Sequence, residues 1–228
     1  MKREPTLDVF LKDVDGHQMT VLLDQGLYRH LKFLAPKNSW NHWFEIVTYP
    51  NKLVLSGDMG TWVFSRVEDM FTFFRSDDLT INLGYWSEKL KNGTSGGRDN
   101  AKEYDGEYYK ENILEHLDGY DLEPEKKAKV VEELNSLDFH DEYEITSQIR
   151  DFEVDLEDDG DYDYRSPRKK RETFSFQDVW EVSRQTYSYH FVWCCYAIVW
   201  GIQQWDKRGL LTPPAPTADP QKPEPRHR

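Results

Sequence analysis

The chain has 228 residues, of which 38% are hydrophobic and 14% aromatic, so it can build a sizeable core in one or two domains. Its two cysteines are too few for a disulfide scaffold, and its composition excludes collagen-like and fully disordered chains. The 42 acidic and 29 basic residues give a formal net charge of −13, which disfavours contact with bare nucleic acid or acidic lipid and favours a basic partner.

Residues 1–98 carry 12 acidic and 12 basic residues and predict a β-rich region. Short apolar or alternating runs are separated by turn residues such as Asp15-Gly16, a pattern typical of antiparallel hairpins. The predicted strands are residues 7–12, 19–24, 31–34, 43–49, 53–55 and 62–64. After the last strand, Ser65 and Glu68 match a capping box and predict a short helix that packs on the sheet.

Residues 99–163 hold 24 acidic and 6 basic residues, a net charge of −18, and predict two amphipathic helices. In the first helix, apolar residues recur every four positions, at Tyr109, Ile113 and Leu117. The second follows Pro124, a residue that the first turn of a helix tolerates. Polar and apolar residues alternate from Tyr143, so residues 143–156 are predicted as a strand with a bulge.

Residues 164–228 carry 11 basic and 6 acidic residues and contain the longest apolar run of the chain. Ser175 is the predicted N-cap of a long helix that ends near Gly209. Because residues 191–202 are apolar on every side, we expect them at the centre of the core, and they are too few to span a bilayer. The proline-rich residues 210–228 predict a disordered tail.

These elements predict an α+β fold, in which an N-terminal antiparallel sheet packs against a long, buried C-terminal helix and an acidic helical region is inserted. The expected parts are a β-rich region (1–98), an acidic helical region (99–163), a basic linker with the core helix (164–209) and the tail (210–228). Cys194 and Cys195 are adjacent and cannot form an ordinary disulfide on a helix, and no signal-peptide segment is recognisable. A reducing, cytoplasmic location is therefore expected.

The standard signatures of catalytic, nucleotide and metal sites are not found, so we predict no cofactor and no metal and assign no catalytic residue. Residues 155–163 resemble the first half of a calcium-binding loop, but Ser166 stands where that loop needs a bidentate glutamate. They are interpreted as a solvated acidic linker. The basic residues 165–171 either fold back on this linker or contact phosphates.

Asp58 lies between two glycines in a predicted turn, where the backbone can approach a ligand closely. One hypothesis is therefore a pocket for a nucleotide or another small ligand, in which aromatic rings stack on a base and an arginine pairs with phosphate. Its candidate residues are His30, Asp58, Trp62, Arg66, Tyr85 and Trp86. The structural alternative is a tight turn in which the aspartate bonds its own backbone. His190 is similarly interpreted as a hydrogen-bonded core histidine.

Several sequence blocks resemble a widespread family of small phage and prophage proteins of unassigned function. The blocks are HLKF from His30, WFEIVTYP from Trp43, GDMGTWVFSR from Gly57, DMFTFFR from Asp69 and YHFVWCCYAIVWGIQQW from Tyr189. They cover the β-rich region and the core helix. The resemblance implies a phage accessory protein that acts inside a bacterial cell, and it transfers no catalytic residue. The acidic region and the proline tail are less typical of this family.

The leading hypothesis is a binding protein that inhibits a host defence or nucleic-acid enzyme by imitating DNA. Carboxylates displayed on helices can occupy a basic groove built for phosphates, and such association is fast and salt-sensitive. The candidate contact residues are Glu107, Glu111, Glu115, Asp118, Glu132, Glu133, Asp138, Asp141, Glu142 and Glu144. No direct contact with nucleic acid or membrane is expected. The simpler alternative is that the acidic residues only keep the domain soluble.

Overall fold

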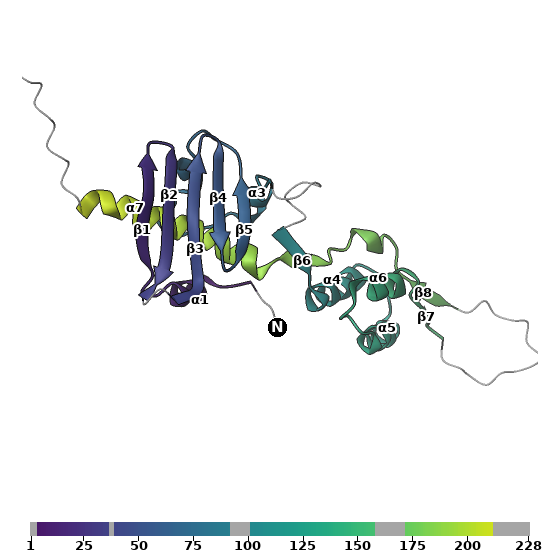
Figure 1. Cartoon of the computed structure of the whole chain (residues 1–228). Helices are drawn as coiled ribbons and strands as arrows, with labels where there is room; N and C mark the ends of the chain where they lie inside the picture. Colours follow the sequence, from purple (N-terminus) through teal and green to yellow (C-terminus); the bar gives the residue numbers. More distant parts are fainter. Residues whose placement is uncertain (1–3, 37–38, 92–100, 158–171, 212–228) are drawn as a thin grey trace, which may run out of the picture. The chain divides into compact units, whose positions relative to one another are not determined.

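The computed structural model describes residues 4–36, 39–91, 101–157 and 172–211. The chain divides into two compact units (Figure 1). Unit 1 comprises residues 1–101 and 188–228, and unit 2 comprises residues 102–187. Unit 2 is therefore inserted between two stretches of unit 1. It joins the predicted acidic region with a following segment that the sequence analysis had assigned to the basic linker and the long helix.

Unit 1 is built on a five-stranded antiparallel sheet in which the strands follow one another in chain order. The strands are β1 (Gln18–Gln25), β2 (Tyr28–Ala35), β3 (Ser39–Tyr49), β4 (Lys52–Gly57) and β5 (Gly60–Phe64). Alternate side chains, such as Leu31 and Phe33 of β2, are fully buried, because successive residues of a strand point to opposite faces. The antiparallel hairpins predicted between residues 31 and 64 are confirmed.

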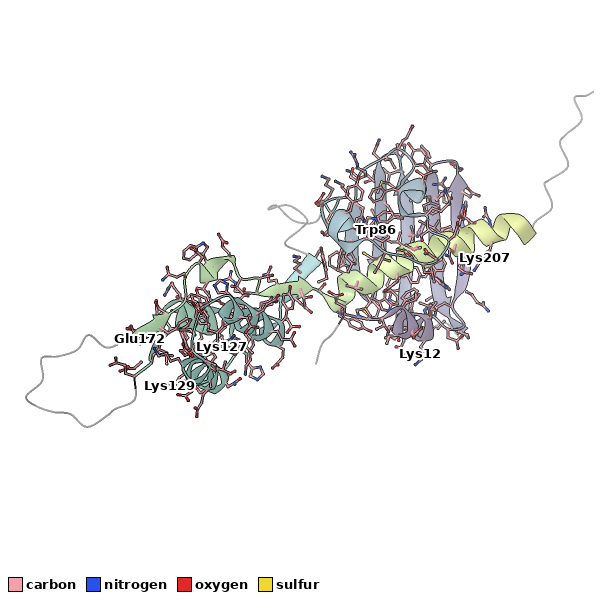
Figure 2. All side chains as sticks on the ribbon, turned by 180° about the vertical axis from the view of Figure 1, so that it is seen from behind. Lys12, Trp86, Lys127, Lys129, Glu172 and Lys207 are labelled. Atoms are coloured by element: carbon pink, nitrogen blue, oxygen red, sulfur yellow. The ribbon has the colours of Figure 1, made fainter. Side chains whose placement is uncertain are left out.

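The long helix α7 (Tyr189–Leu211) crosses one face of this sheet (Figures 1 and 2). The short helices α1 (Leu7–Asp13) and α2 (Met70–Phe74) pack against α7, and α3 (Leu83–Ser87) follows α2 in the chain. A Cβ atom at Gly201 would lie 2.7 Å from Cδ1 of Ile46, so the helix approaches the sheet closely at this glycine. The side chains of Phe191, Trp193 and Ile198 are fully buried, which confirms the predicted apolar core helix.

Three expectations for unit 1 and its helix are wrong. Residues 7–12 form the helix α1 and not a strand, because the Thr6 side chain caps it by accepting a hydrogen bond from the Val9 amide. Helix α2 is capped by Asp69 and not by the predicted capping box at Ser65. Helix α7 begins at Tyr189 instead of Ser175 and continues to Leu211, past the predicted end at Gly209.

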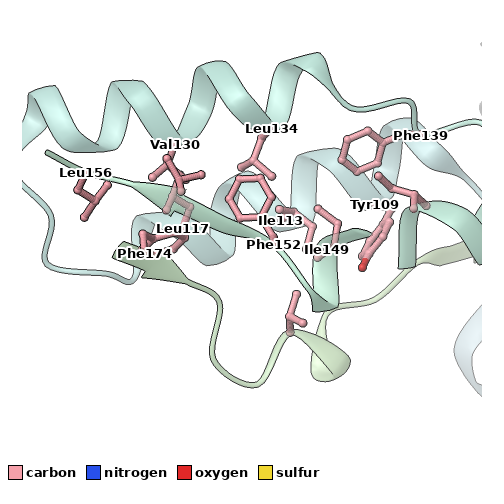
Figure 3. Packing of buried hydrophobic residues seen from close by; sticks show 13 residues of the cluster. Tyr109, Ile113, Leu117, Val130, Leu134, Phe139, Ile149, Phe152, Leu156 and Phe174 are labelled. Carbon is pink, nitrogen blue, oxygen red and sulfur yellow. The ribbon is translucent and has the colours of Figure 1, made fainter. Parts of the chain in front are cut away.

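The described residues of unit 2 form three α-helices and two small antiparallel ribbons. Its elements are β6 (Lys102–Tyr104), α4 (Gly106–Asp118), α5 (Pro124–Ser136), α6 (Glu142–Arg150), β7 (Glu153–Asp155), β8 (Thr173–Ser175), the 3₁₀ turn η3 (Val179–Glu181) and β9 (Gln185–Tyr187). Strand β6 pairs with β9, and β7 pairs with β8. The core is largely aliphatic and includes Ile113, Leu117, Leu134 and Ile149 (Figure 3).

The structure confirms the two predicted amphipathic helices as α4 and α5 but corrects the segment that follows them. Residues 143–156 form the helix α6 and the short strand β7, not one bulged strand. Asp141 caps α6 by accepting from the Glu144 amide, and the buried Ile145 and Ile149 lie one helical turn apart. Tyr143, which began the apparent alternation, is 89% exposed.

Three other predictions fall wholly or partly on residues that the structure does not describe. These are residues 158–171, with most of the predicted acidic linker and the whole basic stretch, and residues 212–228 of the predicted tail. Within the described ranges, no helix combines the length and the apolar character needed to cross a bilayer.

Candidate functional site

One face of α4 carries a row of carboxylates, here called the acidic stripe: Glu107, Glu111, Glu115 and Asp118. All four residues are exposed. Their intervals of four, four and three residues place them on one side of a helix that turns by about 100° per residue. The buried side chains of α4 occupy the opposite side. At a rise of about 1.5 Å per residue, the stripe extends over roughly 16 Å.

Acidic residues outnumber basic residues in unit 2. Unit 2 contains 26 acidic and 12 basic residues, and the part that the structure describes contains 22 acidic and 7 basic residues. Each of these seven bases is already engaged. The ion pairs are Lys126–Glu172 and Lys127–Asp118 at 2.6 Å, Arg150–Asp151 at 3.0 Å and Arg184–Glu142 at 3.9 Å.

The remaining three bases of this part contact rings or a carbonyl group. Lys102 lies over the ring of Tyr187 and Lys110 over the ring of Phe139, at 5.2 and 5.6 Å from the ring centroids. Lys129 donates a hydrogen bond to the backbone carbonyl of Glu157. Asp118, at the C-terminal end of the stripe, therefore has a lysine partner.

The other predicted contact residues have different environments. Glu132 and Glu133 are exposed on α5. Asp138 and Asp141 accept hydrogen bonds from the backbone amides of His140 and Glu144. Their carboxylates therefore stabilise the backbone at and just before the start of α6. Glu142 faces the arginine at position 184. The structure therefore gathers only the α4 residues of the predicted set into one row.

The predicted ligand pocket of unit 1 does not gather its six residues into one group. Arg66 donates from Nε to the Tyr85 hydroxyl at 3.3 Å, and Trp86 is buried against the ring of Phe74. His30 instead pairs with Glu45 at 2.6 Å.

The two remaining residues of the predicted pocket contribute to the turn between β4 and β5. Trp62 is buried and donates from Nε1 to the carbonyl of Met59. Asp58 accepts a hydrogen bond from the backbone amide of His42 at 3.0 Å, and its own amide donates to the carbonyl of Trp43. Asp58 therefore binds the neighbouring strand β3 through both its carboxylate and its amide. His190, expected in the core, is exposed at the start of α7.

A cluster around His42, whose backbone has a positive φ of 55°, was not predicted from the sequence. The ring of His42 stacks on Trp193, and its Nε2 lies 3.8 Å from Oδ2 of Asp13. The same carboxylate oxygen accepts a hydrogen bond from Trp193 Nε1 at 3.0 Å. His17 contacts the carbonyl of His42 through Nε2, while its Nδ1 is buried without a hydrogen-bond partner. The only signal in the sequence was Asp58, which holds the His42 amide.

This cluster ties the N-terminal helix to the sheet and to α7. Burial lowers the pKa of the His17 imidazole and so favours the neutral form of the ring. Burial also raises the pKa of the thiols of Cys194 and Cys195, both free cysteines, so neither is a reactive thiolate. Across the described residues, no three histidine, cysteine, aspartate or glutamate side chains are placed to share a metal ion.

Comparison with known proteins gives no relative for this chain. No family model, no curated protein and no solved structure matches the chain.

Proposed function

We propose that unit 2 is a binding module that occupies a positively charged surface of a partner protein. The observation that supports this most directly is the acidic stripe of α4, an exposed row of carboxylates in a unit whose described part contains 22 acidic and 7 basic residues. Such a row produces a negative potential that attracts a basic surface over a distance of about one Debye length, ~8 Å at physiological ionic strength.

The stability of α4 does not explain the stripe. Like charges four residues apart destabilise a helix by about 0.2–0.5 kcal/mol per pair, and Glu111 has such a neighbour on either side. Carboxylates in the last turn also face the negative end of the helix dipole, where Asp118 lies. Net charge favours solubility wherever it lies on the surface, so solubility alone does not require carboxylates aligned on one helix face. A function in binding accounts for this arrangement better than solubility does.

The charge spacing resembles that of a nucleic-acid strand only in part. The four carboxylates cover roughly 16 Å, whereas one strand of DNA carries a phosphate about every 3.4 Å along the helix axis. The exposed Glu132 and Glu133 of α5 add charge to the same unit. We therefore propose a decoy that uses the electrostatic attraction of a nucleic acid without copying its full charge density.

The partner that fits this surface is a host protein with a basic groove for phosphates. The resemblance of the β-rich region and the core helix to small phage proteins suggests an accessory protein in the bacterial cytoplasm. A nucleic-acid-handling defence enzyme has such a groove, and a phage benefits when that enzyme is inhibited. Binding then blocks the groove by occupying it, and no catalytic chemistry is required of unit 2.

The test uses the full chain with the substitutions Glu107→Gln, Glu111→Gln and Glu115→Gln together. Retention of a DNA- or RNA-handling enzyme from bacterial lysate at low salt should fall by at least tenfold in this variant. Because counterion release governs such contacts, retention by the unsubstituted chain should also weaken steeply between about 50 and 200 mM salt. Nucleic acid added as a competitor should displace the chain from the enzyme.

The matched control neutralises three exposed carboxylates of unit 1, with Asp8→Asn, Asp15→Asn and Glu68→Gln. It changes the net charge by the same amount and leaves the stripe intact. If the control variant loses retention to the same extent, overall charge and not the stripe is responsible. Failure of the unsubstituted chain to retain any nucleic-acid enzyme would refute the proposal.

A further inference from the structure

Unit 2 exposes two aromatic side chains on elements that pack together. Tyr143 of α6 is 89% exposed and Trp180 of η3 is 74% exposed, the highest values among the large hydrophobic side chains that the structure describes. Helix α6 packs against η3. Ile145 of α6 and Val179 of η3 are buried in the same hydrophobic core. This core holds in place both elements that carry the exposed rings.

A hollow of about 420 Å³ lies beside Tyr143. It is lined by Glu142, Tyr143, Thr146, Ser147, Arg150 and Arg184. Arg184 donates to the Thr146 hydroxyl, and Arg150 donates to the Ser147 hydroxyl. Together with their carboxylate partners, these contacts hold both guanidinium groups in place. Polar contacts between neighbouring side chains therefore run along the wall of the hollow.

The backbone next to Trp180 is strained. Asp178, which precedes η3, has a φ of 52°, a left-handed conformation that residues other than glycine seldom adopt. Such conformations cost about 1–3 kcal/mol and persist where the surrounding structure enforces them, often at binding sites. Here the strain belongs to the turn that places Val179 in the core and Trp180 in solvent.

The charge around these rings specifies the partner. Residues 138–151 and 172–187 together contain eight acidic residues and two arginines, and each arginine lies beside a carboxylate. A partner surface that meets both rings must therefore supply positive charge around an apolar recess. An acidic protein or a nucleic acid would be repelled by the same carboxylates.

We propose that the face formed by α6 and η3, here called the α6–η3 face, is where a basic partner protein docks, with Trp180 and Tyr143 as its apolar anchors. This inference rests on the proposed function and names the contact that holds the complex. Tryptophan, tyrosine and arginine are the residues that dominate binding energy at protein interfaces. Helix α6 carries Tyr143 and Arg150, and η3 carries Trp180.

The two surfaces of unit 2 then have separable roles. Exposed charges mainly raise the association rate, whereas buried anchors mainly slow dissociation. The acidic stripe attracts the partner, and the rings of Tyr143 and Trp180 retain it. Trp180→Ala should make dissociation about 30-fold faster, the equivalent of ~2 kcal/mol for an interface anchor.

The experiment places the photo-crosslinking residue p-benzoylphenylalanine at position 143 or 180 of the full chain in bacterial cells. Position 28 serves as the matched control, because Tyr28 is also an exposed tyrosine, at 53%, but lies in unit 1. The expected result is one discrete adduct at positions 143 and 180 with a basic protein, and none with that protein at position 28. Adduct formation at position 180 should fall with Tyr143→Ser.

Three outcomes overturn the docking proposal: no adduct at positions 143 and 180, an adduct with an acidic protein or a second copy of this chain, or an equal adduct at position 28. The glutamine substitutions at Glu107, Glu111 and Glu115 separate this proposal from the proposed function. If they abolish retention of the enzyme while positions 143 and 180 form no adduct, the stripe functions without this docking face. If they leave the adduct at position 180 unchanged, the docking face stands and the proposed role of the stripe fails.

Discussion

Unit 1 and unit 2 use their charged and aromatic residues in opposite ways. Unit 1 contains 17 basic and 16 acidic residues and holds seven of the eight tryptophans, whereas unit 2 has a net charge of −14 and a single tryptophan, Trp180. In unit 1, large rings such as Phe44 and Trp193 are fully buried. In unit 2, the core is mostly aliphatic and the one tryptophan faces solvent. Trp193 therefore stabilises the core of unit 1, whereas the single tryptophan of unit 2 is available for binding.

The connection between the units supports their treatment as separate modules. The amide of Ser188 donates a hydrogen bond to the carbonyl of Ala101 at 2.9 Å, so the two chain segments that lead into unit 2 are adjacent. Strands β6 and β9 continue this pairing at the start and end of unit 2. An insertion whose ends meet in this way interrupts its host fold at one point only. We therefore expect mutations in one core to leave the other unit folded.

The largest effect is expected for Trp193→Ala in the core of unit 1. The substitution removes a fully buried ring and leaves Oδ2 of Asp13 without the indole donor, so unit 1 should lose about 3–5 kcal/mol of its free energy of unfolding. Urea unfolding followed by tryptophan fluorescence reports mainly on unit 1, because unit 2 has one tryptophan. The helical circular dichroism of unit 2 should persist after that transition.

Trp180→Ala is the matched control for this experiment. Because this side chain is 74% exposed, its truncation should change the stability of either unit by less than about 0.5 kcal/mol. If the tryptophan fluorescence and the helical circular dichroism of the Trp193→Ala protein change together, the two units unfold as one. They would then not be independent modules.

A smaller effect is expected for alanine at a glycine of each unit. At Gly106 in unit 2, a Cβ atom would lie 2.1 Å from the carbonyl oxygen of Phe139, a backbone atom that cannot move without shifting its whole segment. At Gly201 in unit 1, the nearest atom at 2.7 Å is the end of the Ile46 side chain, which can rotate. Gly106→Ala should therefore destabilise unit 2 by about 2–3 kcal/mol and Gly201→Ala should destabilise unit 1 by about 1 kcal/mol.

Thermal unfolding of the two glycine variants, followed by circular dichroism, provides the comparison. Equal decreases in stability would indicate that the backbone around Phe139 shifts at as little cost as the Ile46 side chain. A loss confined to the Gly201→Ala protein would show that the first turn of α4 is less tightly packed than its contacts imply.

The sequence pattern was sufficient where one helix or strand buries one regular face. The spacing of Tyr109, Ile113 and Leu117 predicts α4, and the apolar residues 191–202 predict the buried centre of α7. Both patterns are local, because each depends on residues within a few helical turns.

The pattern failed where local signals competed or contacts were distant. Ile145 and Ile149 fit either a strand or one helix face, and the cap at Asp141 decided for a helix. Ser175 resembled a helix cap, but it lies in a strand that pairs with residues 153–155, far away in the sequence. The net charge of unit 2 could be counted from the sequence, whereas the ion pair of Lys126 with Glu172 depends on the fold.

The stability of unit 1 should decrease in acid, in part because of His17. Burial lowers the pKa of folded His17 below its ordinary value of 6.5, so the unfolded chain takes up a proton first as the pH falls. The contribution of His17 to stability is complete above about pH 7.5 and is lost as the pH falls through 6.5 toward the folded pKa. The effect is smaller than that of a core substitution, because the half-buried ring is partly screened by water.

His17→Gln removes this titration while an amide can still donate to the carbonyl of His42. Urea midpoints of unit 1 measured from pH 8 to pH 5 should fall less steeply for this variant than for the unsubstituted protein. The midpoint of unit 2 should show the same pH profile in both proteins. A parallel decrease for unit 1 in the two proteins would mean that other groups control the acid sensitivity.

The smallest effect separates the stability of the acidic stripe from its function. Glu115 lies between Glu111 and Asp118, toward the negative end of the α4 dipole, so Glu115→Gln should stabilise unit 2 by about 0.5 kcal/mol at low salt. Glu107 lies in the first turn, where the dipole favours a carboxylate, so Glu107→Gln should give no gain or a small loss. Urea unfolding at low and high salt measures both changes, and the difference should shrink at high salt. If both variants also bind the partner more weakly, opposite effects on stability accompany the same effect on binding, and selection for stability cannot be the reason that α4 keeps these carboxylates.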